Sequence, residues 1–157
     1  MKSHMKSQPS FQENVVNVIF DTDLRVILFT GDINDKSQIR ISSDAASIQF
    51  PLRTVGRLPH GEATYDQHPV LWRTESPTLS ASTSDVSLIQ LGVVNGNLST
   101  SENHFPFQVK VWYQEKLYTS HDPTIITEPR EGGIQPVVPP ACDAASDTMP
   151  AEARASA

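Results

Sequence analysis

The chain has 157 residues, a formal net charge of −6 and only 12 lysine and arginine residues, which are scattered along the sequence. This length predicts a single domain with its own hydrophobic core, and the scattered basic residues argue against a surface that follows nucleic-acid phosphates. Because no apolar run reaches the 18 residues of a membrane span and the N-terminus lacks a signal-peptide stretch, we expect a cytoplasmic protein without nucleic-acid or membrane partners.

Both ends of the chain differ in composition from its middle. Residues 1–12 are polar and lack periodicity, and residues 130–157 are rich in proline, alanine, serine and glycine. Such segments bury too little apolar surface to offset the entropy lost on ordering, so we expect both ends to be disordered. The sequence therefore predicts one folded domain over residues 13–129.

Short β-branched and alternating runs occupy the first half of this domain. They predict strands at residues 14–20, 24–29, 38–42 and 46–50. The second of these runs is also short enough for one turn of helix. Ser43 and Asp44 predict a hairpin turn between the last two strands. Residues 52–68 contain two glycines and a proline without any period, and we expect a long loop there.

The second half contains the clearest strand, residues 105–113 (FPFQVKVWY). Its apolar side chains fall on alternate positions: Phe105, Phe107, Val109, Val111 and Tyr113. We expect these to pack inward, with Trp112 on the solvated face. Residues 114–116 predict a tight polar connection, and the Ser/Thr-rich residues 76–84 predict another connection. Further strands are predicted at residues 69–75, 85–91, 117–119 and 122–128.

About eight or nine short strands, with turn signals between them and almost no helical periodicity, predict an all-β fold. One solvated face is typical of antiparallel sheets, so we expect an antiparallel β-sandwich or jelly roll in a single domain. The expected core includes Phe107, Val109, Val111, Trp72, Ile19 and Leu88.

Four segments of the chain resemble one family. They are residues 14–23 (NVVNVIFDTD), 70–73 (VLWR) with 85–88 (DVSL), 107–111 (FQVKV) and 122–127 (DPTIIT). In order and spacing they resemble the bacterial inclusion-body protein family typified by AidA and PixA. The resemblance implies a compact β-sandwich without known catalytic residues, accumulation in inclusions and, as an open alternative, sugar binding. It assigns fold-bearing positions to Asp21, Trp72, Arg73, Asp85, Asp122 and Pro123.

Several side chains are candidates for metal binding or catalysis. The four carboxylates Asp21, Asp23, Asp32 and Asp35 do not have the spacing of an EF-hand, so we expect turn residues that bond their own backbone. The histidines lack zinc-ligand spacing and are expected in loops: His60, His68, His104 and His121. No GxSxG turn occurs. The sequence thus predicts no metal site, no cofactor and no catalytic residue.

The tryptophans suggest carbohydrate binding, because an aromatic face complements the apolar C–H face of a pyranose. Trp112 lies on the polar face of its strand, whereas Trp72, beside Val70 and Leu71, is expected in the core. The candidate ligand-binding residues are Trp112, His104 and Asp122.

We therefore expect a non-enzymatic, self-associating protein, a homodimer or larger assembly, that binds carbohydrate or a partner protein. Self-association is expected at the closing strand, residues 123–128, which begins with a proline and is interpreted as a sheet edge. The alternative is a small β-sandwich hydrolase or metal-dependent enzyme. It would require at least three of six side chains to converge in one cleft: Asp21, Asp23, His60, His68, His104 and His121.

Overall fold

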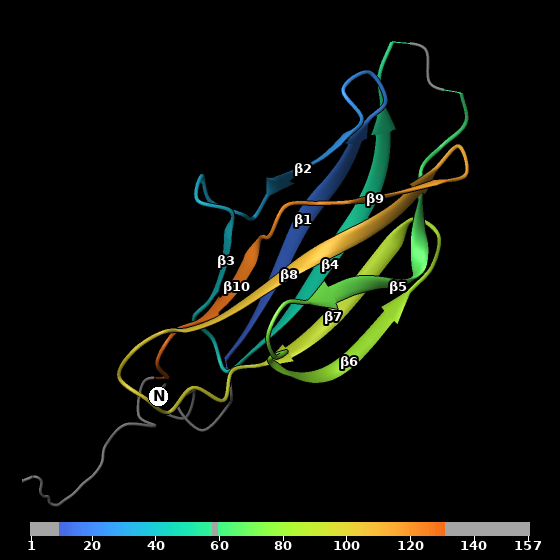
Figure 1. Cartoon of the computed structure of the whole chain (residues 1–157). Helices are drawn as coiled ribbons and strands as arrows, with labels where there is room; N and C mark the ends of the chain where they lie inside the picture. The colour runs from blue at the N-terminus through green and yellow to red at the C-terminus, as the bar shows by residue number, and fades with distance from the viewer. Residues whose placement is uncertain (1–9, 58–59, 131–157) are drawn as a thin grey trace, which may run out of the picture. The chain divides into compact units, whose positions relative to one another are not determined.

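A computed structural model describes residues 10–57 and 60–130. It contains ten strands and no helix in this part of the chain (Figure 1). The prediction of an all-β fold is confirmed. The expected disorder concerns mainly residues 1–9 and 131–157, which lie outside the described residues. The first strand begins at Phe11, two residues before the predicted boundary of the folded domain. No helix long and apolar enough to cross a membrane occurs in the described ranges.

The chain divides into two units, of which the first, Met1–Asn95 with His104–Ile126, carries most of each sheet. The first sheet has the strand order β2-β1-β4-β7-β6. Its strands are β1 (Phe11–Asp21), β2 (Val26–Gly31), β4 (Ala45–Val55), β6 (Thr78–Ser84) and β7 (Leu88–Val94). β1 pairs with β4 in parallel, whereas the β1–β2, β4–β7 and β6–β7 pairs are antiparallel.

The parallel pair corrects the expectation of purely antiparallel sheets. Parallel neighbours need a crossover connection, and here the chain leaves the first sheet after β2, forms β3 in the second sheet and returns as β4. For the same reason Ser43 and Asp44 do not form the predicted hairpin turn, because the strands on either side of them belong to different sheets.

The second sheet has the order β3-β10-β8-β5, and β9 also pairs with β8. Its strands are β3 (Gln38–Ile41), β5 (Thr64–Trp72), β8 (Asn103–Tyr113), β9 (Lys116–Thr119) and β10 (Thr124–Thr127). The predicted tight connection between β8 and β9 is confirmed. Both of its central residues, Gln114 and Glu115, have positive φ (51° and 65°), as a two-residue type I′ hairpin turn requires.

The closing strand is not an edge, which corrects the prediction for residues 123–128. β10 lies between β3 and β8, and Ile125 and Ile126 are both fully buried. Pro123 does not prevent this position, because its carbonyl accepts a hydrogen bond from the backbone nitrogen of Phe107 (3.0 Å). The prediction that a second copy of the chain pairs with this strand is therefore wrong.

The core lies between the two sheets. As predicted, all five alternate positions of β8 are buried, none more than 9% exposed. They meet the inward side chains of the first sheet: the rings of Phe50 and Phe107 are 5.9 Å apart, and those of Phe20 and Tyr113 are 5.0 Å apart. In Figure 1, β8 runs across the strands of the first sheet that supply these partners. The main inward residues of that sheet are Val16, Val18, Phe20, Ile48, Phe50, Ile89, Leu91 and Val93.

Three of the six predicted core residues are only half-buried: Ile19, Leu88 and Trp72. Ile19 lies between Val18 and Phe20, which take the inward positions, and Leu88 precedes the buried Ile89. In a continuous apolar run the sequence does not decide which of the two alternating sets faces the core.

Two predicted connections are partly or wholly strand. β4 continues to Val55 and β5 begins at Thr64, so residues 52–55 and 64–68 of the predicted long loop belong to strands. Most of the Ser/Thr-rich residues 76–84 belong to β6, which pairs with β7. Its side chains carry no strong strand signal, and the pairing with β7 makes it a strand.

The second unit is Gly96–Asn103 with Thr127–Ala157. In its described part, the side-chain nitrogen of Asn97 donates to the carbonyl oxygens of Ser101 and Thr127, both at 2.8 Å. The carbonyl of Asn97 accepts a hydrogen bond from the backbone nitrogen of Arg130 (3.1 Å). Asn97 therefore joins the two segments of this unit.

Candidate functional site

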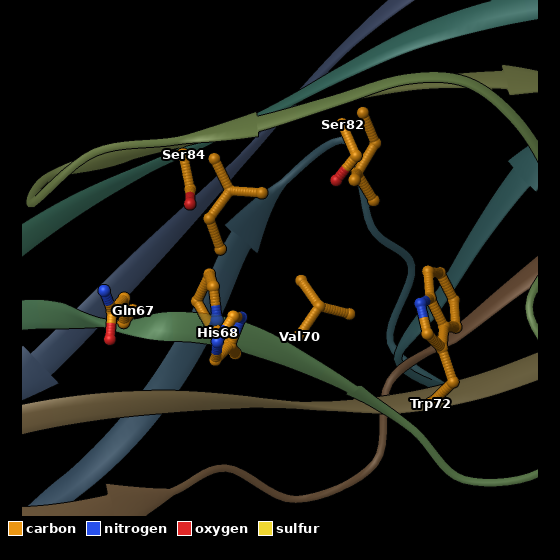
Figure 2. A pocket seen from close by; sticks show the side chains of 9 residues that line it. Gln67, His68, Val70, Trp72, Ser82 and Ser84 are labelled. Carbon is orange, nitrogen blue, oxygen red and sulfur yellow. The ribbon is translucent and has the colours of Figure 1, made fainter.

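A cleft of about 300 Å³ opens between the two sheets where β5 faces β6 (Figure 2). β5 and β6 are the terminal strands of their sheets, so the cleft lies at an open side of the sandwich. Its volume is at the lower end of the range of small-molecule sites. The residues that line it are Gln67, His68, Pro69, Val70 and Trp72 from β5, Ser82 and Ser84 from β6, and Ile89 and Leu91 from β7.

Polar side chains occupy both walls of the cleft. Figure 2 shows the hydroxyl groups of Ser82 and Ser84 on β6, across from Gln67 and His68 on β5. Within the part of the chain that the structure describes, these four side chains and the indole nitrogen of Trp72 have no hydrogen-bond partner. The cleft therefore offers several hydrogen-bond donors and acceptors to a ligand.

The floor of the cleft is apolar. Ile89 and Leu91 are each 1% exposed and belong to the core. Trp72 is half-buried and packs on the ring of Phe107, with the centroids 5.5 Å apart. The predicted core role of Trp72 thus accounts for only one side of its ring system, because the side chain also lines the cleft.

A bulge in β5 shapes the wall that carries Gln67 and His68. Tyr65 pairs with Val111 and Val70 pairs with Val109, so four residues of β5 lie opposite a single residue of β8. Consecutive side chains of a regular strand point to opposite faces, whereas a bulge re-aims them. The bulge thereby allows Gln67 and His68, which are adjacent in sequence, to line the same cleft.

Asp66 is the first residue of this bulge, and its carboxylate has three partners. It accepts hydrogen bonds from the indole nitrogen of Trp112 (2.6 Å) and from the backbone nitrogen of His68 (3.0 Å), and it lies 3.5 Å from the ammonium group of Lys110. The hydrogen bond from Trp112, followed by that from His68, holds the pKa of Asp66 below its usual range. The carboxylate is thus ionised and well anchored at neutral pH.

Tyr65, the residue before the bulge, is anchored on the inner side. Its hydroxyl group donates a hydrogen bond to the carbonyl of Phe50 (2.8 Å), across the core in the first sheet. Burial raises the pKa of the Tyr65 hydroxyl. The neutral phenol therefore persists at physiological pH and joins β5 to β4.

The opposite wall also contains an irregularity. The pairing of β6 with β7 shifts between Leu79 and Ala81. A Cβ atom on Gly92 of β7 would lie 2.5 Å from the hydroxyl oxygen of Ser80. Glycine at position 92 therefore leaves the space into which the bulged residue Ser80 fits.

The three predicted ligand-binding residues are not brought together. Trp112 is 39% exposed, as expected, but its indole nitrogen is bonded to Asp66 and its side chain does not line the cleft. His104 is exposed near the start of the same strand, and its separation from Trp112 by eight positions corresponds to about 26 Å along the strand. Asp122 forms an exposed ion pair with Arg73 at 3.1 Å.

The sequence pattern misses Gln67, Ser82 and Ser84, because it assigns them to connections between strands. The sequence nevertheless contains one signal, since a proline inside a polar strand segment (DQHP, residues 66–69) marks an edge strand or a bulge. No comparable signal distinguishes Ser82 and Ser84 from other loop serines.

The six residues of the enzyme alternative are dispersed, and only His68 lines the cleft. Asp21 accepts hydrogen bonds from the backbone nitrogens of Asp23 (2.8 Å) and Leu24 (3.1 Å), which confirms its predicted turn role. The prediction that all four histidines lie in loops is wrong for His68 and His104, which belong to β5 and β8. Among the described residues, no group of three His, Cys, Asp or Glu side chains could hold a metal ion.

No family model matches the chain, and no curated protein matches it. Among solved structures, the chain is similar to the crystal structure of an inclusion body protein (PixA) from Burkholderia cenocepacia J2315. The alignment covers 78% of this chain and 97% of that chain, with 7% sequence identity and a TM-score of 0.38. A likeness at this level is not evidence of a shared function. The family membership inferred from the sequence motifs therefore stays a prediction.

Proposed function

We propose that this chain is a non-enzymatic binding protein whose β5–β6 cleft takes a small neutral carbohydrate. The observation that carries the proposal is the set of unpartnered polar groups on both walls of the cleft, above an apolar floor. A pyranose has the matching chemistry, with hydroxyl groups around its rim and an apolar C–H face that packs on an indole.

The composition of the lining favours a neutral ligand. The cleft is lined by amide, hydroxyl, indole and imidazole groups and by aliphatic side chains, without Asp, Glu, Lys or Arg. A charged ligand would lose hydration on entering without gaining an opposite charge, which is costly. A polyhydroxylated ligand can exchange its bonds to water for bonds to Gln67, Ser82 and Ser84.

The hydrolase alternative rests on His68, which lies across the cleft from two serines. A serine nucleophile needs a base within hydrogen-bond reach, and the base must be oriented by a third group. In the described structure the His68 ring bonds to neither Ser82 nor Ser84, and Asp66 bonds the backbone of His68 rather than its ring. These contacts favour binding over hydrolysis.

The test is a titration of the full-length protein with methyl glucosides, galactosides and mannosides. Binding is measured by calorimetry or from chemical-shift changes. We expect one of them to bind, and Gln67→Ala, Ser82→Ala and Ser84→Ala each to weaken binding by about 2- to 12-fold, since a lost neutral hydrogen bond is worth about 0.5–1.5 kcal/mol. The matched control is Gln49→Ala, on the exposed face of β4, which should change nothing.

Two outcomes contradict the proposal. The first is a folded protein that binds none of these sugars. The second is turnover of p-nitrophenyl esters that is lost in both His68→Ala and one of the two serine variants, because such a dependence would establish the hydrolase.

We also propose self-association, at β2 instead of the closing strand. β2 is an edge of the first sheet and its sequence, VILFTG, has no charged side chain to oppose pairing with another chain. Val26 and Leu28 are 39% and 43% exposed. Light scattering should show an assembly that Leu28→Lys converts to monomer. Monomeric unmodified protein at high micromolar concentration would contradict this proposal.

A further inference from the structure

We propose that Asp66 is the positioning residue of the cleft: its carboxylate holds the bulge of β5 in the shape that presents Gln67 and His68 to a ligand. The inference rests on the proposed carbohydrate site and concerns how one of its walls is built.

The bulge needs such support because it interrupts the backbone ladder between β5 and β8. Residues 66–69 lie opposite Lys110 alone, so their backbone groups cannot all pair with the neighbouring strand. The Asp66 side chain replaces part of the ladder by accepting the backbone N–H of His68, two residues ahead, as in an Asx turn. Pro69 follows and has no N–H to satisfy.

The neighbouring strand anchors the same carboxylate from the other side. On β8, Lys110 lies opposite the interruption and Trp112 lies two positions further along the strand. Trp112 and Lys110 approach Asp66 at 2.6 Å and 3.5 Å. The Asp66 side chain is only 19% exposed, and hydrogen bonds to an ionised acceptor are stronger than neutral ones. The carboxylate is therefore a fixed point between β8 and the main chain of His68.

None of the three anchoring residues reaches the cleft. Asp66, Lys110 and Trp112 are absent from its lining, whereas Gln67 and His68 belong to it. Any effect of Asp66 on ligand binding must consequently pass through the conformation of the bulge. This arrangement also gives Trp112, which the sequence singles out as a ligand-stacking residue, an indirect role.

The inference is tested with three variants that weaken the support in steps. Trp112→Phe removes one donor, Asp66→Asn keeps an acceptor but loses the charge, and Asp66→Ala removes the whole support. We expect affinity for the bound methyl glycoside to fall in that order, by about tenfold or more in Asp66→Ala, because hydrogen bonds to charged groups are the stronger ones. The matched control is Asp32→Asn. In the unmodified protein the carboxylate of Asp32 also accepts a backbone N–H, that of Val15 (2.7 Å), but in the other sheet.

A second measurement separates this inference from the proposed function. The amide signals of Gln67 and His68 in ¹H–¹⁵N spectra of the ligand-free protein report the bulge directly. They should shift strongly in Asp66→Asn and Asp66→Ala, weakly in Trp112→Phe and not in Asp32→Asn. If no sugar binds the unmodified protein but this pattern is seen, the carbohydrate proposal fails and the role of Asp66 stands. Amide signals or sugar affinity unchanged in Asp66→Ala would overturn the role of Asp66.

Discussion

β8 and β5 are neighbours in the same sheet, but they are built in different ways. In β8 every second side chain from Phe105 to Tyr113 is buried, and the strand is regular along the face that packs on the first sheet. In β5 the alternation stops for four residues, and the side chain of Asp66, bonded to Trp112, bridges the interruption. The comparison teaches that a core strand is specified by its own periodicity, whereas the strand at the cleft depends on side chains of its neighbour.

The largest expected difference in stability is between a lysine placed in the central strand β10 of the second sheet and one placed in the edge strand β2 of the first. Ile126→Lys in β10 places a charge where the side chain is fully buried, and we expect destabilisation of about 4 kcal/mol or more, sufficient to unfold a marginally stable domain. Leu28→Lys at the exposed edge β2 should retain the fold. Circular dichroism of both variants measures the difference, and a folded Ile126→Lys variant would contradict the central position of β10.

A smaller difference in unfolding free energy is expected between truncations in the neighbouring strands β8 and β5. Val109→Ala in β8 should cost about 1–3 kcal/mol of unfolding free energy, since its side chain is fully buried. Leu71→Ala in β5 removes more atoms, yet the side chain is 44% exposed and the loss should stay below about 1 kcal/mol. Denaturant midpoints measure both values. Equal losses in the two variants would contradict the assignment of β8 as the core strand.

The support of the bulge should respond to acid. The pKa of Asp66 is held below its usual value, near 3.9 in an unfolded chain, so its stabilising bonds are fully present above about pH 4 and are lost as the pH falls through the lower folded value. In a Trp72→Phe background, the fluorescence of Trp112 should change with a midpoint below about pH 3.9.

Asp66→Asn is the control for this titration, because Lys110 and His68 are the other titratable groups near the carboxylate and both persist in the variant. The fluorescence change should disappear in it. A midpoint at or above the ordinary aspartate value would show that the bonds to Asp66 do not form in solution.

The smallest expected effect concerns the ion pair of Arg73 and Asp122. These side chains are 45% and 44% exposed, so solvent screens their attraction and Arg73→Ala should cost about 0–1 kcal/mol. Urea unfolding measures this value. A loss above about 2 kcal/mol would mean that the pair has a structural role beyond that of an ordinary surface ion pair.

Much of the fold could be predicted because its signals are local. Alternation over residues 105–113 was sufficient to place five side chains in the core and Trp112 outside, and the polar pair Gln114 and Glu115 was sufficient for a tight turn. Where a run is apolar throughout, as around Ile19, both faces satisfy the local pattern, and burial was predicted on the wrong side.

By itself, the sequence determined that the chain forms strands, which side of β8 packs inward and that Trp112 lies on the solvated face. Only the tertiary structure decided that β10 lies inside a sheet, that β1 and β4 run parallel, and that Ser82 and Ser84 face His68 across a cleft. The physical reason is that periodicity arises within a strand, whereas strand order and bulges depend on contacts between segments far apart in the chain. Asp66 and Trp112, 46 positions apart and joined by one hydrogen bond, are such a contact.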